Sequence, residues 1–408
     1  MSTQTRPIAP APSPWPKVAG VVALLTVIVS VLLTAFAWPS VRSSVHDVPI
    51  AVAGPATATG PVTAALQQRL PGGFDITPVA DTAAAERLIR DREVYGAVDV
   101  SGAVPQVLTA SAASATIAQT LQGVATALGQ ARSATPGPAV AVRDIVALPA
   151  DDPRGAGLGA AALPLVMGAL ITAVLLTGLL RGAGRRVAGA LAFSVTGGLA
   201  MAAILQFWFG SIGGAYLANA GAVALTVAAI STTLLGLEAL LGYPGFGLGA
   251  ALMMLVGNPF AGSATAPEML PGWGGALGQL LPPGAGGQLL RCTAFFDGAG
   301  SGHAVTVLLS WLALGVSLCL VSGLRTGRAA TGGDAGAGRA ATGGDAGAGR
   351  AATGGDAGAG RAATGGDAGA GRAATGGDAG AGRAATGGDA GAGRAATARP
   401  AGAGQAPA

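Results

Sequence analysis

"VAGALAFSVTGGLAMAAILQFWFGSIGGAYLANAGAVALTVAAISTTLLGL", residues 187–237, runs from Arg186 to Glu238 without a charged side chain. A helix that crosses the hydrocarbon core of a bilayer needs about 20 mostly apolar residues, so this stretch has room for two crossings and a turn. The turn is expected at the glycine-rich sequence GSIGG, 210–214, because glycine lets the chain reverse. The stretch therefore predicts two adjacent membrane-spanning helices, 187–209 and 215–237.

Four other stretches have the same apolar character. Residues 18–38, "VAGVVALLTVIVSVLLTAFAW", follow a proline-rich leader, 1–17, that ends at Lys17. They exceed the apolar run of about 7–15 residues found in a signal peptide, so a membrane anchor is expected, with a cleavable signal as the alternative. The remaining candidates are 158–180, 246–256 and 303–323. Six spans are predicted, and five are the alternative because 246–256 is short.

The composition of the whole chain agrees with lipid as its main surroundings. Charged residues make up 10% of 408 residues, whereas about 25% is usual in soluble domains. Apolar residues reach 51%, and the mean hydropathy is +0.57. The formal net charge of +4 comes without a basic cluster, so nucleic acid is not expected as a partner. The predicted fold class is an α-helical integral membrane protein with membrane lipid around it.

The residues that carry common catalytic chemistry are scarce. A Walker A loop needs a lysine after its glycines, and the single lysine, Lys17, follows a proline. The two cysteines, Cys292 and Cys319, and the two histidines, His46 and His303, do not have the spacing of a zinc site. No catalytic, cofactor-binding or metal-binding residue is predicted, and the chain is not expected to be an enzyme.

Arginines in the short loops predict the orientation. Arg181, Arg185 and Arg186 join the second and third spans, and Arg325 follows the sixth. Loops rich in Lys and Arg stay in the cytoplasm. With six spans, these arginines and both termini lie on the cytoplasmic side of the cell's cytoplasmic membrane. Residues 39–157 and 258–302 then lie outside it.

Residues 39–157 predict a small extracytoplasmic α/β domain between the first and second spans. Short β-branched runs bounded by Gly or Pro predict strands at 48–53, 74–77, 94–100, 106–109 and 140–148. Asp81 can cap a helix that carries Ala85, Leu88 and Ile89 at helical spacing. A second helix places Ile117, Leu121, Val124 and Leu128 on one face.

The segment 258–302 is too rich in Pro and Gly to span the membrane and too apolar to be free in water. Trp273 and Phe295 suit the headgroup region. An interfacial hairpin is predicted here, within the membrane domain 158–324. Glu268 and Arg291 are expected to pair across it.

The C-terminal tail, 325–408, has a different composition. The unit RAATGGDAGAG repeats six times through 328–393. Each of its four glycines opposes helix formation by about 1 kcal/mol, and no side chain larger than Thr supplies an apolar seam. A disordered cytoplasmic tail is predicted.

The order of these segments resembles that of the ABC type-2 transporter permeases, and most of all their YhgE/phage-infection-protein-like branch. The resemblance covers about residues 18–324. It is carried by the stretches "REVYGAVDV" (92–100), "LTASAASA" (108–115), "LMMLVGNPFAG" (252–262), "PEMLP" (267–271) and "GQLLPPGAGGQLLRCTAFFDGAG" (278–300).

The resemblance implies a homodimeric permease subunit that exports a hydrophobic or amphipathic compound with a separate cytoplasmic ATPase. Apart from the termini, the predicted topology leaves two short stretches in the cytoplasm, 181–186 and 238–245. The candidates for coupling or transport are then the charged residues Arg185, Arg186 and Glu238 in these stretches. The alternative is a non-transporting envelope protein, such as a secretion-apparatus component or a phage-receptor-like protein. In that case the extracytoplasmic domain binds another protein.

Overall fold

The computed structural model describes residues 13–132, 140–263 and 265–325. All the described elements belong to one unit by their mutual contacts. Most of the leader 1–17 and all the repeats at 328–393 lie outside the described residues. The disorder of the tail therefore stays a prediction.

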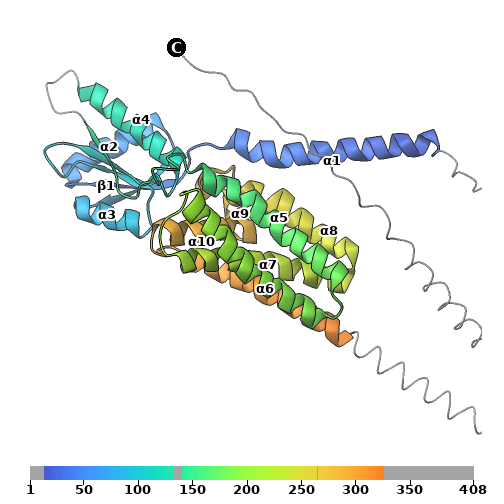
Figure 1. Ribbon diagram of the computed structural model, residues 1–408. Helices are drawn as coiled ribbons and strands as arrows, with labels where there is room; N and C mark the ends of the chain where they lie inside the picture. The colour runs from blue at the N-terminus through green and yellow to red at the C-terminus, as the bar shows by residue number, and fades with distance from the viewer. Residues whose placement is uncertain (1–12, 133–139, 264, 326–408) are drawn as a thin grey trace, which may run out of the picture. The chain divides into compact units, whose positions relative to one another are not determined.

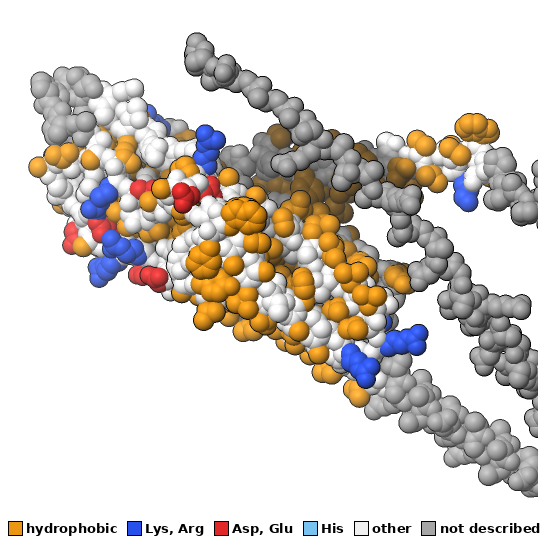
Figure 2. Space-filling model, in the orientation of Figure 1, with side chains coloured by type: hydrophobic (Ala, Val, Ile, Leu, Met, Phe, Trp, Pro, Cys, Tyr) orange, Lys and Arg blue, Asp and Glu red, His pale blue; other side chains and the backbone are white. Residues whose placement is uncertain are grey.

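Five of the described helices are long and apolar enough to cross a membrane, so the chain is a helical multi-pass membrane protein. They are α1 (Trp15–Arg42), α5 (Ala156–Leu179), α6 (Ala183–Ala203) with the π-helical turn η1 (Ile204–Trp208), α7 (Tyr216–Leu241), and a last span, Gly302–Arg325 (Figure 1). The predicted turn at 210–214 is confirmed, and both Gly210 (φ 61°) and Gly214 (φ 72°) adopt left-handed backbone there. Figure 2 shows hydrophobic side chains along the flanks of these helices.

The fifth predicted span, 246–256, falls in a shorter apolar segment. Helix α8 (Tyr243–Ala251) continues into the π-helical turn η2 (Leu252–Gly257), and together they are shorter than the five candidate spans. Gly242, with φ 71°, separates α8 from α7, and Pro259 follows the end of η2. These breaks explain why the segment is too short to be counted with the other spans.

Helix α7 is the central helix of the membrane domain. Of its most apolar 18 residues, 78% are buried inside the protein, whereas the same figure for α1 is 0%. Two hydroxyl groups inside α7 are satisfied within the helix: Thr226 donates to the carbonyl of Ala222 and Thr232 to that of Ala228. The hydroxyl of Thr233 donates instead to the carbonyl of Trp311 in the last span. Small and self-satisfied side chains let the neighbouring helices approach α7 closely.

A five-stranded sheet lies between α1 and α5 in the sequence. Its order is β2-β1-β3-β4-β5, and every pair is parallel except β3 with β4. The strands are β1 (Val48–Ala53), β2 (Phe74–Val79), β3 (Gly96–Asp99), β4 (Gln106–Thr109) and β5 (Ala141–Asp144). All five overlap the predicted strands. This unit is called the sheet domain below.

Three helices accompany the sheet (Figure 1). Helix α3 (Thr82–Arg90) begins after Asp81, whose carboxylate accepts a hydrogen bond from the backbone N–H of Ala84 at 2.7 Å. Helix α4 (Ala115–Arg132) buries Ile117 and Leu121. Both helices confirm the predictions. Helix α2 (Ala56–Arg69) was not predicted, because Pro61 and three threonines interrupt its pattern.

The segment 258–302 contains four short helices rather than the predicted hairpin. They are η3 (Pro259–Ala261), η4 (Pro267–Met269), α9 (Gly274–Gln279) and α10 (Pro282–Phe295). Ten residues of α10 are buried, and α10 packs on α7 and α5. Ala266, Met269 and Phe296 join the hydrophobic core of the sheet domain. Segment 258–302 thus contributes side chains to the core of the membrane helices and to the core of the sheet domain.

The close contact between α7 and the last span predicts the effect of one methyl group. A Cβ added at Gly236 would lie 2.8 Å from the carbonyl oxygen of Gly315 and 2.7 Å from Cβ of Leu318. Gly236→Ala should lower the free energy of unfolding by about 1–3 kcal/mol through overpacking. Thermal unfolding of the purified protein in detergent measures this. Gly221→Ala on the same helix is the control, since a Cβ there meets nothing within 4 Å. Equal melting temperatures for the two variants would contradict the described packing.

Candidate functional site

The candidate site lies on α5, α6 and α7, and its first part is the tight link between α5 and α6. Helix α5 ends at Leu179, and α6 begins at Ala183. Gly182, with φ 90°, reverses the chain direction between them. Arg181 and Arg185 are exposed at this link, whereas Arg186 is half-buried. The three arginines of the predicted cytoplasmic loop thus have different surroundings.

The guanidinium of Arg186 binds groups from two other helices. Nη1 lies 3.0 Å from Oε2 of Glu238 near the end of α7. Nε donates to the carbonyl of Leu180 at 2.9 Å, and Nη2 donates to the carbonyl of Thr177 at 3.0 Å. The last carbonyls of a helix have no partner within that helix, and Arg186 supplies partners to two carbonyls at the end of α5. One side chain therefore joins α5, α6 and α7 at one end.

The structure divides the predicted coupling residues into two kinds. Arg186 and Glu238 bind each other and hold the bundle together. Arg185 is exposed and makes no hydrogen bond or ion pair with any described residue. Of the two neighbouring arginines, only Arg185 is free to contact a partner protein.

The second part of the site is an apolar cavity of about 590 Å³ farther along the same three helices. Pro164 and Gly168 of α5 line it from one side, Phe193 and Met201 of α6 from another, and Val227 of α7 closes it. Small-molecule sites in proteins have volumes of about 300–1,000 Å³ and mostly apolar walls. The cavity can therefore hold an apolar molecule of moderate size.

Arg92 joins the sheet domain to α10. It adopts a left-handed backbone, with φ 63°, after the end of α3. Its Nη2 donates to Oε1 of Gln288 at 3.1 Å, and its Nη1 lies 3.7 Å from Sγ of Cys292. The guanidinium also lies over the ring of Phe296, 4.9 Å from the centroid, where a cation–π attraction adds to the contact. No local pattern in the sequence predicts this junction.

Glu268 and Arg291 do not pair with each other, contrary to the prediction. Glu268 accepts a hydrogen bond from Oη of Tyr95 at 2.8 Å, so it binds the sheet domain. Arg291 donates from Nη2 to the carbonyl of Ser263 at 2.8 Å. Glu268 belongs to η4 and Arg291 to α10, and each side chain has its partner outside the predicted pair.

Burial changes the acidity of two groups near this junction. Burial, and then the charge of Glu268, raise the pKa of Tyr95 well above its ordinary value. Burial, and then the charge of Arg92, lower the pKa of Arg291 to about 10. Tyr95 is therefore neutral and Arg291 positively charged at neutral pH.

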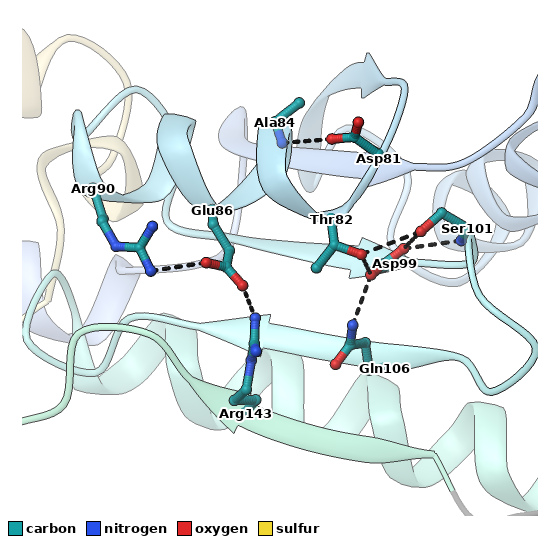
Figure 3. Close-up of polar contacts among 9 residues, drawn as sticks. All are labelled: Asp81, Thr82, Ala84, Glu86, Arg90, Asp99, Ser101, Gln106 and Arg143. Carbon is teal, nitrogen blue, oxygen red and sulfur yellow. Dashed lines mark hydrogen bonds and ion pairs between the residues drawn. The ribbon is translucent and has the colours of Figure 1, made fainter.

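Asp99 is the centre of a polar cluster at the end of β3 (Figure 3). Its carboxylate accepts hydrogen bonds from Thr82 Oγ1 at 2.6 Å, Ser101 Oγ at 2.6 Å, Ser101 N at 2.9 Å and Gln106 Nε2 at 2.8 Å. These groups belong to the start of α3, the loop after β3 and the start of β4. Asp99 thus fixes three elements of the sheet domain, and its donors leave little room for a ligand.

The pKa of Asp99 reflects this cluster. Burial alone raises it, but the hydrogen bonds from Ser101, Thr82 and Gln106 outweigh burial and lower the pKa below its ordinary value. The signal for this role is visible in the sequence, since Asp99 is an acidic residue at the end of a buried strand. The sequence prediction used the strand and overlooked the acid.

The described part of the chain has no group of three or more His, Cys, Asp or Glu residues placed to hold a metal ion. Cys292 and Cys319 are buried free thiols.

Comparisons with models of protein families, with curated proteins and with solved structures find no match to this chain. The function is therefore argued from the geometry of the site.

Removing the charge of Glu238 should destabilise the bundle. In Glu238→Gln, the half-buried guanidinium of Arg186 loses its counter-charge, which should cost roughly 1–3 kcal/mol of unfolding free energy. Thermal unfolding of the purified protein measures this, with Arg185→Gln as the control that leaves the melting temperature nearly unchanged. A double-mutant cycle with Arg186→Gln should give a coupling energy clearly above zero. Additive effects would mean that the pair contributes nothing to stability.

Acid should weaken the sheet domain through Asp99. Because its pKa is lower in the folded state, its contribution is complete above the unfolded carboxyl pKa of about 3.9 and is lost as the pH falls through the folded pKa. Asp99→Asn should reduce the protection of the β3 amides from hydrogen exchange at neutral pH. The variant should also show a smaller loss of this protection as the pH is lowered. Hydrogen exchange of the intact protein, corrected for the intrinsic effect of pH, measures both. An unchanged acid profile in Asp99→Asn would assign the decline to other groups.

Proposed function

We propose that this chain is the membrane subunit of an exporter, which moves a hydrophobic or amphipathic compound across the cytoplasmic membrane with energy from a separate ATPase. The observation that carries the proposal is the apolar cavity of about 590 Å³ between α5, α6 and α7. Its lining matches a compound that partitions into lipid.

The proposal includes six crossings of the membrane. Tyr243–Gly257 supplies the fifth of these crossings although it is short. Gly245 near its start lies close against Leu237 of α7, and Gly257 at its end lies close against Pro283 of α10. The sheet domain and segment 258–302 then lie outside, and both termini lie in the cytoplasm. The arginines of the α5–α6 link support this orientation.

The coupling of the ATPase to transport is assigned to the cytoplasmic end of the three helices. Arg185 is exposed there and offers a planar, bidentate guanidinium to a carboxylate of the partner. The pair Arg186–Glu238 transmits a displacement of the link to α7, because it joins the helix ends. A homodimer, which the family resemblance implies, is also part of the proposal. The uncovered flanks of α1 support it.

A groove in the sheet domain favours a second candidate function. It has a volume of about 320 Å³ and lies between α2 and α4, with Leu66, Val124 and Leu128 in its walls and Arg69 at its edge. A partner protein with an apolar side chain and an acidic neighbour would fit it. In this alternative the chain is a non-transporting envelope protein, such as a secretion-apparatus component or a phage-receptor-like protein.

The orientation predicts a labelling pattern for single cysteines. In a protein with Cys292 and Cys319 replaced by alanine, Gln68→Cys on α2 should react with an impermeant maleimide in intact cells. Gly184→Cys, in the first turn of α6, should react only after lysis. Both positions are exposed, so burial does not limit the reaction. Labelling of Gly184→Cys in intact cells would reverse the proposed orientation.

Filling the cavity should reduce export. A side chain at Gly168 projects into free space beside the cavity, so Gly168→Leu should occupy it and lower export of a fluorescent amphipathic dye from cells at least severalfold. Gly178→Leu on the same helix is the control, because it lies outside the lining and also has free space. Equal export by both variants would show that the cavity is not part of the transport pathway.

The partner is tested by affinity purification from membranes. An ATPase should co-purify with the unaltered protein, and Arg185→Gln should retain less of it without loss of thermal stability. If no ATPase co-purifies and no dye is exported, the envelope-protein alternative takes precedence.

A further inference from the structure

Among the described residues, Arg291 is a buried cation without a counter-charge. Its side chain belongs to α10, and the residue is only 7% exposed. Nη2 binds the carbonyl of Ser263, while Nε has no hydrogen-bond partner among the described residues. The described residues also provide no ion pair for it. Buried charges in proteins are paired or bound to a ligand, because an isolated charge is costly to desolvate.

Two serine hydroxyls on the wall of a neighbouring cavity are also without partners. The Oγ atoms of Ser43 and Ser263 are buried and make no hydrogen bond with any described residue. Both serines line a cavity of about 290 Å³ between the end of α1, the start of α5 and residues 258–270. Asn258 lines the same cavity. The wall thus contains two hydroxyls that no described residue binds, together with an amide side chain.

Ser263 also lines a second, smaller cavity together with Arg291. The volume of this cavity is about 20 Å³. A single water molecule needs roughly 10–15 Å³ and two or more polar partners, so the cavity has room for one water beside the two side chains. A neutral water leaves the positive charge of Arg291 without a counter-ion.

Aromatic side chains mark the level of the larger cavity along α1. The ring of Phe260 lies 5.9 Å from that of Trp38, and the ring of Trp273 lies 6.2 Å from Phe260. Trp273 is exposed. Tryptophans gather at the headgroup region of a bilayer, where the phosphate groups of phospholipids lie.

We propose that the cavity lined by Ser43, Asn258 and Ser263 binds a phosphate group, with Arg291 behind Ser263 as its counter-charge. The serine hydroxyls and the amide of Asn258 donate to phosphate oxygens. The phosphate belongs to a phospholipid headgroup or to a free phosphate ion, and the chemistry of recognition is the same. This site is separate from the transport cavity and does not depend on the proposed function.

Ligand-induced stabilisation of the intact protein tests the site, since a ligand of the folded state raises the melting temperature. The protein is purified in a phosphate-free maltoside detergent and melted with dihexanoyl phosphatidylglycerol, with inorganic phosphate, or with dihexanoylglycerol. Dihexanoylglycerol carries the same acyl chains without phosphate. The phosphatidylglycerol should raise the melting temperature, and dihexanoylglycerol should not. A rise with inorganic phosphate as well would identify free phosphate as sufficient, and a rise with the lipid alone would identify the headgroup.

Two variants locate the bound phosphate. Ser43→Ala and Ser263→Ala each remove an unused hydroxyl and should fold normally, while weakening the binding roughly tenfold, as expected for one hydrogen bond to a charged group. Arg291→Gln should abolish the rise in melting temperature. If the Arg291→Gln protein does not fold, the two serine variants still test the site. Arg185→Gln, on another part of the chain, should respond as the unaltered protein does. Absence of a shift with both phosphate compounds, or full shifts in both serine variants, would overturn the proposal.

Discussion

The ion pair between Arg186 and Glu238 is the interaction on which the arrangement of the membrane helices most depends. It joins the end of α5, the start of α6 and the end of α7 in a domain that otherwise packs apolar and small side chains. Apolar contacts between helices carry little directional information in lipid, because lipid tails are as apolar as leucine. The guanidinium of Arg186, with three fixed partners, does carry directional information. The ion pair therefore sets the register of the helices at one end. The cavity farther along the same helices inherits its shape from that register.

The elements with a strong local pattern could be predicted from the sequence. The charge-free stretch 187–237 gave two spans and their turn, and the strands and helices α3 and α4 followed from periodicity and capping. The pairing of Arg186 with Glu238 could not be predicted, since 52 positions separate them in the chain and nothing local indicates contact. The burial of α10 was also missed. Its prolines and glycines are typical of a loop, yet here the small residues let the helix lie against α7.

The incorrect pairing of Glu268 with Arg291 has the same physical origin. When the rest of the fold is unknown, two opposite charges within one segment lead to the prediction that they pair with each other. Tyr95 instead binds Glu268 from the sheet domain, and the carbonyl of Ser263 binds Arg291. Long-range packing therefore decided the partners of both side chains.

Arg92 makes the sheet domain and the membrane helices mechanically continuous. It binds Gln288 and Cys292 of α10, and a Cβ added at Gly286 of α10 would collide with the side chain of Thr226 on α7. These contacts form a continuous series from the sheet domain through α10 to the most buried helix of the bundle. A displacement of Arg92 is therefore felt by α7 through α10, without passing along the chain that connects them.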